Sequence, residues 1–261
     1  MLGLTAVVLD ATVRTPRRLL VRDVPLAVPG WPAELDGLRV AVVADLHAGA
    51  PAVGLERLGQ VVQQVVAARP NLVVLLCDHL ADVWLGTHLQ PEQWAEVLAG
   101  FLTAAPVVGV LGNHDWYAGG HRVRRALEAA GLPVLEESAV AVLDGRLGVA
   151  GVSDLGERTP SVERALAGVP AGAPVVLLTH NPDVVLDVPA HVQLVLAGHT
   201  HGGQVRVLGR GVHTISERTG NRFTAGWFAP ERLYVTAGVG ASIAPVRTVP
   251  PEVPVLVLGP A

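Results

Sequence analysis

Residue types that bind metal ions fall directly after the short apolar runs of this chain, at the point where each run ends. The set comprises two aspartates, one asparagine and five histidines: Asp45, His47, Asp78, Asn113, His114, His180, His199 and His201. Apolar runs of this length are typical of buried strands. Because ligand sites in α/β sheets form at the carboxyl ends of the strands, we expect these side chains to share one rim.

The spacing of three of these residues fits consecutive parallel strands. Asp45 and Asp78 are 33 positions apart, and Asn113 follows Asp78 by 35 positions. Each interval is close to the length of one β-α-β unit. We therefore expect the three side chains to lie next to one another on the rim.

The donor atoms of the set predict both the kind of metal and the kind of reaction. Carboxylate, amide and imidazole donors suit Mn²⁺, Fe or Zn²⁺ better than Ca²⁺ or Cu⁺. The donors are too numerous for one ion and suit two ions that share one carboxylate. Two ions about 3.5–4 Å apart can clamp the attacking and leaving oxygens of an in-line displacement at phosphorus. The pattern therefore favours a dinuclear site for phosphoryl chemistry.

Alternating strands and helices must position these residues. The first half has strand patterns at residues 38–44, 72–77 and 106–111 and helix patterns at residues 55–68, 91–99 and 121–130. The second half is mainly β, with one short helix at residues 162–167 and strand patterns at 139–143, 147–151, 175–179, 192–197, 204–208, 232–236 and 253–258. Asp144-Gly145 is a hairpin signal. β-α-β units followed by hairpins predict two packed sheets with helices outside them.

The composition excludes several classes of protein. The 261 residues are 50% hydrophobic and 16% charged, which excludes a disordered chain. The net charge is −4, whereas a protein that binds duplex nucleic acid carries a basic surface. All 19 basic residues are arginine, so a Walker A lysine and a Schiff-base lysine are excluded. The single cysteine, Cys77, excludes an internal disulfide.

The N-terminus leaves two interpretations open. Residues 1–9 are mostly apolar, but Asp10 and then three arginines follow them, which is the wrong order of charge for a complete signal peptide. They form either the remnant of a leader or membrane anchor, or an N-terminal strand. No apolar run in the sequence approaches the roughly 20 residues that a membrane-spanning helix needs.

Five motifs stand in the order found in the calcineurin-like metallophosphoesterases, and the chain resembles that superfamily from about residue 38 to residue 258. They are Asp45-Leu46-His47, Asp78, Gly112-Asn113-His114-Asp115, His180 and Gly198-His199-Thr200-His201. The last motif continues as Gly-Gly-Gln, which resembles a bacterial branch of the family. The resemblance implies a four-layer α/β/β/α sandwich of two mixed β-sheets at residues 38–261, preceded by an N-terminal segment or strand at residues 1–37.

The resemblance also implies a role for each residue of the motifs. Seven residues would hold the metals: Asp45, His47 and His201 the first ion, Asn113, His180 and His199 the second, and Asp78 both. His114 would contact the phosphoryl group or protonate the leaving oxygen. Asp115 would orient His114.

The chain departs from the family pattern at the two positions beside Asp78. The family normally has glycine where this chain has Cys77, and it usually has an apolar residue where this chain has His79. In a strand both side chains would point away from Asp78, whereas if the strand has already ended either could approach the metals. We expect Cys77 to be a small buried hydrophobic residue and His79 to be an exposed loop residue that binds no metal.

The resemblance implies a metal-dependent phosphohydrolase in which a metal-bound hydroxide attacks phosphorus. The bond cleaved would be a phosphodiester, a phosphomonoester or a pyrophosphate. The cofactors would be two divalent or trivalent ions, Mn²⁺ first, with Fe or Zn²⁺ as alternatives. The substrate would be a small phosphate ester or a phospholipid-like molecule, since the branch includes enzymes similar to UDP-2,3-diacylglucosamine pyrophosphatase.

Two further points stay open at this stage. The alternative from another class of function is a non-catalytic metal-binding scaffold, against which the complete set of ligands argues. We expect a cytoplasmic protein, with association with the membrane surface as the open alternative.

Overall fold

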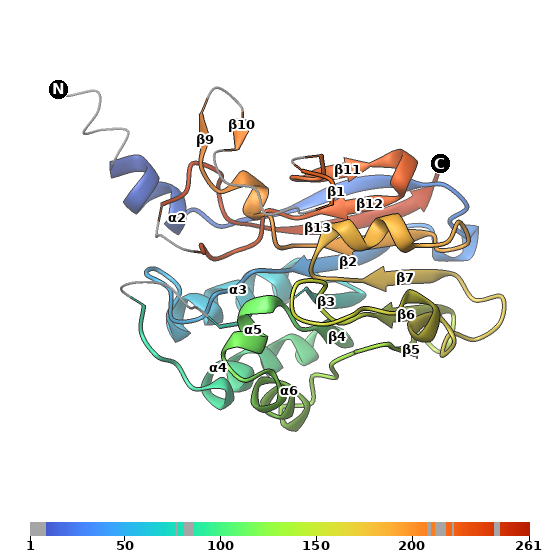
Figure 1. The fold of residues 1–261 in the computed structure, drawn as a ribbon, viewed down its shortest axis with the longest axis horizontal. Helices are drawn as coiled ribbons and strands as arrows, with labels where there is room; N and C mark the ends of the chain where they lie inside the picture. The colour runs from blue at the N-terminus through green and yellow to red at the C-terminus, as the bar shows by residue number, and fades with distance from the viewer. Residues whose placement is uncertain are drawn as a thin grey trace.

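Two packed β-sheets form the centre of the molecule, and helices cover them (Figure 1). The computed structural model describes residues 9–76, 78–80, 86–207, 210–211, 218–220, 222–242 and 246–261. The expectations for Cys77 and for residues 1–8 lie outside the described residues.

The first sheet has five strands in the order β1-β13-β2-β3-β4. Their bounds are Leu20–Val28 for β1, Glu252–Pro260 for β13, Leu38–Val43 for β2, Leu72–Leu76 for β3 and Val107–Val110 for β4. Strands β2, β3 and β4 are parallel, β13 pairs antiparallel with β2, and β1 pairs parallel with β13. The carboxyl ends of β2, β3 and β4 therefore meet at one edge, as the spacing of Asp45, Asp78 and Asn113 predicted.

Three helices cover the outer face of the first sheet: α3 (Leu55–Ala67), α4 (Pro91–Leu98) and α6 (Gly120–Ala129). Helix α3 buries Leu58, Val61 and Val65 on one face, which is the helical spacing expected from the sequence. Helix α4 begins with Pro91 after Gln90, whose backbone N–H donates to the side chain of Gln93 at 2.9 Å.

The second sheet has six strands in the order β11-β12-β8-β7-β6-β5. Their bounds are Gly226–Phe228, Leu233–Val235, Leu194–Ala197, Val175–Leu178, Leu147–Gly151 and Ser138–Val142 in that order. The outer strands β11 and β5 are antiparallel to their neighbours and the inner four are parallel. The short helix α7 (Val162–Leu166) and a 3-10 segment at Pro182–Asp187 pack on its outer face.

Shorter elements complete the described chain. They are a π-helical turn at Asp10–Arg14, α2 (Thr15–Arg17), α5 (Asn113–Tyr117), 3-10 turns at Ala33–Leu35, Ala99–Thr103, His201–Gly203 and Ala229–Glu231, and the paired strands β9 (Arg206–Val207) and β10 (Arg210–Gly211).

An apolar core between the two sheets fixes how their edges face each other. Val40 and Val42 of β2 and Val74 of β3 point inward and are fully buried. They pack with Val149 of β6 and Leu196 of β8 from the second sheet. The layers confirm the expected four-layer α/β/β/α sandwich of two mixed sheets, and the packing holds the strand ends of both sheets at a common rim.

The described part of the N-terminal segment contains one strand that the sequence patterns did not single out. It is β1, at Leu20–Val28, and it pairs along its whole length with β13. Its charged residues and Pro25 break the apolar pattern expected of a buried strand. An edge strand tolerates both. Residues 20–28 are thus part of the first sheet, while the division of the chain at residue 37 stays a prediction. None of the described helices has the length and apolar character needed to cross a bilayer.

Candidate metal centre

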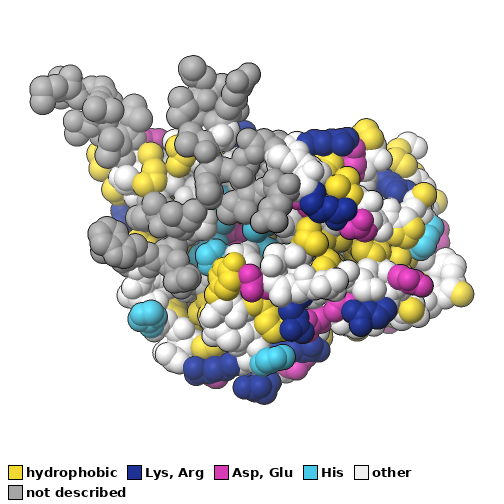
Figure 2. Space-filling model, viewed as in Figure 1, with side chains coloured by type: hydrophobic (Ala, Val, Ile, Leu, Met, Phe, Trp, Pro, Cys, Tyr) yellow, Lys and Arg dark blue, Asp and Glu magenta, His cyan; other side chains and the backbone are white. Residues whose placement is uncertain are grey.

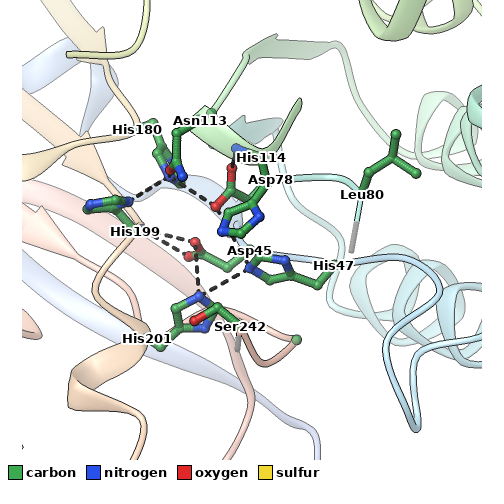
Figure 3. A network of polar contacts seen from close by, with 12 residues as sticks. Asp45, His47, Asp78, Leu80, Asn113, His114, His180, His199, His201 and Ser242 are labelled. Carbon is green, nitrogen blue, oxygen red and sulfur yellow. Dashed lines mark hydrogen bonds and ion pairs between the residues drawn. The ribbon is translucent and has the colours of Figure 1, made fainter. Parts of the chain in front are cut away.

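The predicted residues meet where the strands of both sheets end (Figure 3). The first sheet supplies the residues that follow β2, β3 and β4: Asp45, His47, Asp78, Asn113 and His114. The second sheet supplies the residues that follow β7 and β8: His180, His199 and His201. Histidine side chains are visible near the middle of this face of the molecule (Figure 2). The rim is therefore built jointly by the two sheets.

Asp45, His47 and His201 form a first triad, which is buried and whose ligand atoms all lie within 4.8 Å of one another. His47 Nε2 and His201 Nε2 are 3.2 Å apart, and Asp45 Oδ1 lies 3.8 Å from His201 Nε2. The backbone N–H of His199 donates to both oxygens of Asp45, at 3.0 and 3.1 Å. The loop after β8 thus fixes the carboxylate that the loop after β2 supplies.

Asp78, His180 and His199 form a second buried triad with the same spread of ligand atoms. His180 Nε2 lies 3.2 Å from Asp78 Oδ2, 2.9 Å from His199 Nδ1 and 3.1 Å from Asn113 Oδ1. The other ring nitrogen, His180 Nδ1, lies 3.1 Å from the carbonyl oxygen of Leu76. A proton on Nδ1 satisfies that carbonyl and leaves the lone pair of Nε2 facing the triad.

Asp78 lies between the triads. Its Oδ2 is 3.2 Å from His180 Nε2 in the second triad and 3.8 Å from His47 Nε2 in the first. Its Oδ1 accepts the backbone N–H of His114 at 2.9 Å, which orients the carboxylate from the loop after β4. This is the position that a carboxylate shared by two ions requires.

The backbone of the rim is strained at several of these residues. Five of them have positive φ angles: Asp45 at 49°, His47 at 46°, Asp78 at 51°, His199 at 73° and His201 at 51°. Residues other than glycine occupy this region rarely and at a cost of about 1–3 kcal/mol each. Such strain persists only where the surrounding structure holds it, and it is concentrated at functional sites.

Burial sets the protonation states of the first triad. It lowers the pKa of His47 to about 4 and that of His201 well below its usual value, so both rings are neutral at neutral pH. It raises the pKa of Asp45 to about 7, against the opposing effect of His180. Burial alone would also raise the pKa of Asp78, but His180 and then His47 hold it well below its usual range.

These donors fit a pair of metal ions. Metal binding needs neutral imidazoles, and the rings of His47 and His201 are neutral. Their Nε2 atoms face each other at 3.2 Å, where at most one can carry a proton, and a cation beside Asp45 would engage both lone pairs. The mix of carboxylate and imidazole donors, which requires no thiolate, suits Mn²⁺, Fe or Zn²⁺.

His114 lies beside both triads without belonging to either. Its ring meets the ring of His47 edge-on, with centroids 5.0 Å apart, and lies 5.7 Å from the ring of Tyr117. Tyr117 is 59% exposed, so it stands at the open side of the site. The ring of His114 therefore lies between the first triad and the exposed Tyr117.

Asp115 contacts His79 instead of His114, which corrects the expected pairing. Its carboxylate lies 2.9 Å from His79 Nδ1 and accepts the backbone N–H groups of His79 at 2.9 Å and Leu80 at 3.3 Å. It also accepts the N–H of Gly112 at 3.2 Å, which folds it back over the start of α5. Because neighbouring residues on a helix point in different directions, the side chain of Asp115 points away from that of His114.

The exposure expected for His79 is also wrong. Only 1% of this residue is exposed, and its ring stacks on Trp94 of α4 with centroids 5.0 Å apart and planes 9° apart. Strand β3 ends at Leu76, so alternation along a strand does not set the direction of His79. The polar contact with Asp115 and the stacking on the Trp94 ring turn it into the core.

Sequence reasoning overlooked one carboxylate at the rim, Asp154. It is 1% exposed, and its Oδ2 accepts the backbone N–H groups of Gly156 at 2.8 Å and Glu157 at 3.0 Å. Burial raises its pKa, while the nearby His180 lowers it. Asp154 follows the end of β6, so the rule that identified the other residues would have found it.

Comparison with known proteins agrees with the geometry. The family model for calcineurin-like phosphoesterases matches residues 38–203. A zebrafish (Danio rerio) transmembrane protein with a metallophosphoesterase domain is 31% identical over 87% of this chain, which spans 54% of that relative's length. The phosphodiesterase YaeI of Escherichia coli is 30% identical over 84% of this chain and 82% of its own length.

Among solved structures, the 5'-nucleotidase precursor of Thermus thermophilus overlaps 69% of this chain and 45% of its own, with 17% identity and a TM-score of 0.46. The family match covers more than half of the chain and includes Asp45, Asp78, Asn113, His180, His199 and His201. The chain belongs to the calcineurin-like phosphoesterase family.

Proposed function

We propose that this protein is a dinuclear-metal-dependent phosphoesterase. The observation that carries the proposal is the position of Asp78 Oδ2, which lies within 3.8 Å of a histidine nitrogen of each triad. A site for two unrelated ions would not need a carboxylate between them. A non-catalytic scaffold would not need His114 beside them.

Each residue of the five motifs that bears a metal-binding or titratable side chain has a defined part in the proposal. Seven residues hold the ions: Asp45, His47 and His201 the first, Asn113, His180 and His199 the second, and Asp78 both. When bound, the two ions supply a nucleophilic water at neutral pH and neutralise charge on the phosphoryl oxygens. His114 contacts the phosphoryl group or gives a proton to the leaving oxygen. Asp115 acts at a distance, by holding His79 and the loop that carries Asp78.

A phosphodiester is the substrate class that we favour, because a relative 30% identical to this chain is named a phosphodiesterase. Phosphomonoesters and pyrophosphates, including a nucleotide-diphospho-lipid, are the alternatives. Mn²⁺ is the metal that we favour, with Fe and Zn²⁺ next. We keep a cytoplasmic location, with contact to the membrane surface as its alternative, as a prediction.

The test is a matrix of metals against substrates. Metal-free protein is loaded with Mn²⁺, Zn²⁺, Fe²⁺ or Mg²⁺ and offered p-nitrophenyl phosphate, its bis-ester, a cyclic nucleotide or a nucleotide-diphospho-lipid. His180→Ala removes a ligand, and His191→Ala removes an exposed histidine far from the rim as the matched control.

We expect hydrolysis by the wild type and by His191→Ala, greatest on the diester with Mn²⁺, and none by His180→Ala. Activity confined to the lipid arm would move the substrate class to pyrophosphates. Two ions bound with no hydrolysis of any substrate would favour the scaffold.

A further inference from the structure

A bend at residues 237–240, here called the glycine turn, packs directly against the backbone of the first triad. The N–H of Val239 donates to the carbonyl of Ala44 at 3.0 Å, and the N–H of Gly240 donates to the carbonyl of Asp45 at 2.6 Å. A Cβ atom at Gly238 would lie 2.7 Å from Asp45 Oδ2. A Cβ atom at Gly240 would lie 2.8 Å from the Cβ of His47. Only glycine allows this approach.

Arg247 holds the glycine turn from behind. Its Nη2 donates to the carbonyl of Ala237 at 2.7 Å, and its Nη1 donates to the carbonyls of Gly240 and, at 3.4 Å, Gly238. Its Nε donates to the carbonyl of Val249 at 3.0 Å. One planar guanidinium therefore ties three carbonyls of the turn to the chain that leads into β13.

The burial of Arg247 marks it as more than a packing residue. It has no exposed surface, which is rare for a charged side chain because desolvation is costly. Burial lowers the pKa of Arg247 to about 10, so it stays charged at neutral pH, with Asp45 and then Glu252 as the nearby opposing charges. Its five N–H donors in a rigid fork match several carbonyls at once, which a lysine cannot do from one nitrogen.

The strain at the first triad needs such a support. Asp45 and His47 both have left-handed φ angles, which relax unless neighbouring structure holds them. The glycine turn is that neighbour, since it bonds to the carbonyl of Asp45 and contacts the side chains of both residues. Whatever fixes the turn therefore fixes the approach of Asp45 and His47 to His201.

We propose that Arg247 is a positioning residue for the first metal: its guanidinium fixes the glycine turn, and the turn fixes Asp45 and His47. The proposal rests on the proposed dinuclear site for its metal readout. It predicts that loss of Arg247 weakens binding of the first ion more than binding of the second. The ring of His180 in the second triad is held instead by the carbonyl of Leu76 and the side chain of Asn113.

The test compares Arg247→Met, which removes the charge and the fork, with Arg247→Lys, which keeps only the charge. Leu258→Ala is the control, because it truncates a fully buried side chain in the core between the sheets, on strand β13, which follows Arg247 in the chain. Metal-free proteins are titrated with Co²⁺ and followed by visible absorption. His201→Ala and His199→Ala, which each remove a ligand of one triad, assign the two binding steps.

We expect Arg247→Met to weaken the first Co²⁺ step by about tenfold to a hundredfold, the usual effect of losing a residue that orients a metal ligand, and to leave the second nearly unchanged. Arg247→Lys should resemble Arg247→Met if the fork matters more than the charge. Leu258→Ala should lower the melting temperature without changing the ratio of the two steps. Equal loss at both steps in Arg247→Met, or wild-type binding in Arg247→Lys, would overturn the proposal.

A second readout needs no metal. Amide hydrogen exchange at Val239 and Gly240 should quicken in both Arg247 variants, because these variants remove hydrogen bonds to the glycine turn. It should stay slow in Leu258→Ala, which leaves those hydrogen bonds in place. Unchanged exchange would overturn the link between Arg247 and the turn. If the wild type itself binds no pair of ions, the proposed function fails, while the exchange experiment still decides whether Arg247 holds the turn.

Discussion

The two triads of the rim are held in different ways. In the first, Asp45, His47 and His201 all have left-handed φ angles, and the glycine turn lies against the backbone of Asp45. In the second, His180 follows the regular strand β7 and its ring is anchored by the carbonyl of Leu76 at 3.1 Å. Asp78 and His199 of the second triad also have left-handed φ angles, so strained backbone is common to both sites. The sites differ in what supports them: the glycine turn lies against the first, and the carbonyl of Leu76 holds the ring of His180 in the second.

The carboxylates of the two triads differ as well. Burial raises the pKa of Asp45 to about 7, whereas His180 and His47 hold the pKa of Asp78 well below its usual range despite burial. Metal binding at the first triad must displace a proton from Asp45 below neutral pH, and Asp78 is already ionised. Binding of the two ions should therefore respond differently to changes in the backbone and to pH. Only a change at Asp78 should affect the binding of both ions in the same way.

The largest effect is expected from Asp78→Asn, because this carboxylate reaches both triads. The variant should lose hydrolysis to background and bind both ions more weakly. Elemental analysis and rate measurement on one preparation check both statements. Two ions per chain with a near-normal rate would exclude the bridging role.

His114→Ala should keep both ions and lose about 10²–10⁴-fold in kcat on an ester with a poor, alkoxide-like leaving group, the usual size of general acid assistance. An activated nitrophenyl ester needs less protonation, so its rate should fall less. Rates on the two esters, for wild type and variant, separate proton donation from phosphoryl contact. Equal losses would favour contact, and a missing ion would make His114 a ligand.

Gly240→Ala should weaken the first ion by about tenfold or more and spare the second, because the new Cβ would meet His47 at 2.8 Å and displace a ligand. The matched control is Gly59→Ala in helix α3, where a Cβ meets nothing within 4 Å and alanine favours the helix. Co²⁺ titration measures both steps. Parallel weakening of both ions would contradict the difference between the triads.

The affinity for the first ion should rise with pH by about tenfold between pH 5 and pH 6 and level off above pH 7, because Asp45 releases one proton with a pKa of about 7. His47, with a pKa of about 4, stays neutral through this range. Asp78 adds no such step to the second ion. Metal titrations in buffers from pH 5 to pH 8 test this. An affinity for the first ion that does not change with pH would contradict it.

The smallest effect is expected at His79. Its ring faces Asp115 and Trp94, so His79→Ala should keep both ions and change the rate by less than about tenfold, or 1.4 kcal/mol of barrier. His79→Asn keeps a donor near Asp115 and should change the rate less than His79→Ala. Metal analysis and steady-state kinetics give the answer, and a lost ion in either variant would make His79 part of the metal site.

The sequence predicted the sheet architecture and the rim because both follow from local patterns. Apolar runs such as residues 72–76 predict buried strands, and a polar residue at the end of each run predicts its place at the edge. What it could not predict depends on contacts between distant segments. Asp115 meets His79 across 36 positions, and the direction of either side chain cannot be inferred from its neighbours in sequence.

Arg247 shows the same limit more strongly. Nothing in the sequence distinguishes it from the other arginines, since its burial accompanies the contacts of its guanidinium with the distant carbonyls of residues 237–240. Strand β1 was overlooked for a different reason. Its pattern is that of an exposed edge, with Arg22, Asp23 and Pro25, and only the pairing with β13 makes it a strand.

The most direct test of the central claim is a crystal structure of Mn²⁺-loaded protein, with the ions located by anomalous scattering. We predict two ions per chain about 3.5–4 Å apart, with the carboxylate of Asp78 touching both, Asp45 on the first ion and Asn113 on the second. A single ion, or two ions well beyond that separation with no shared carboxylate, would contradict the dinuclear site.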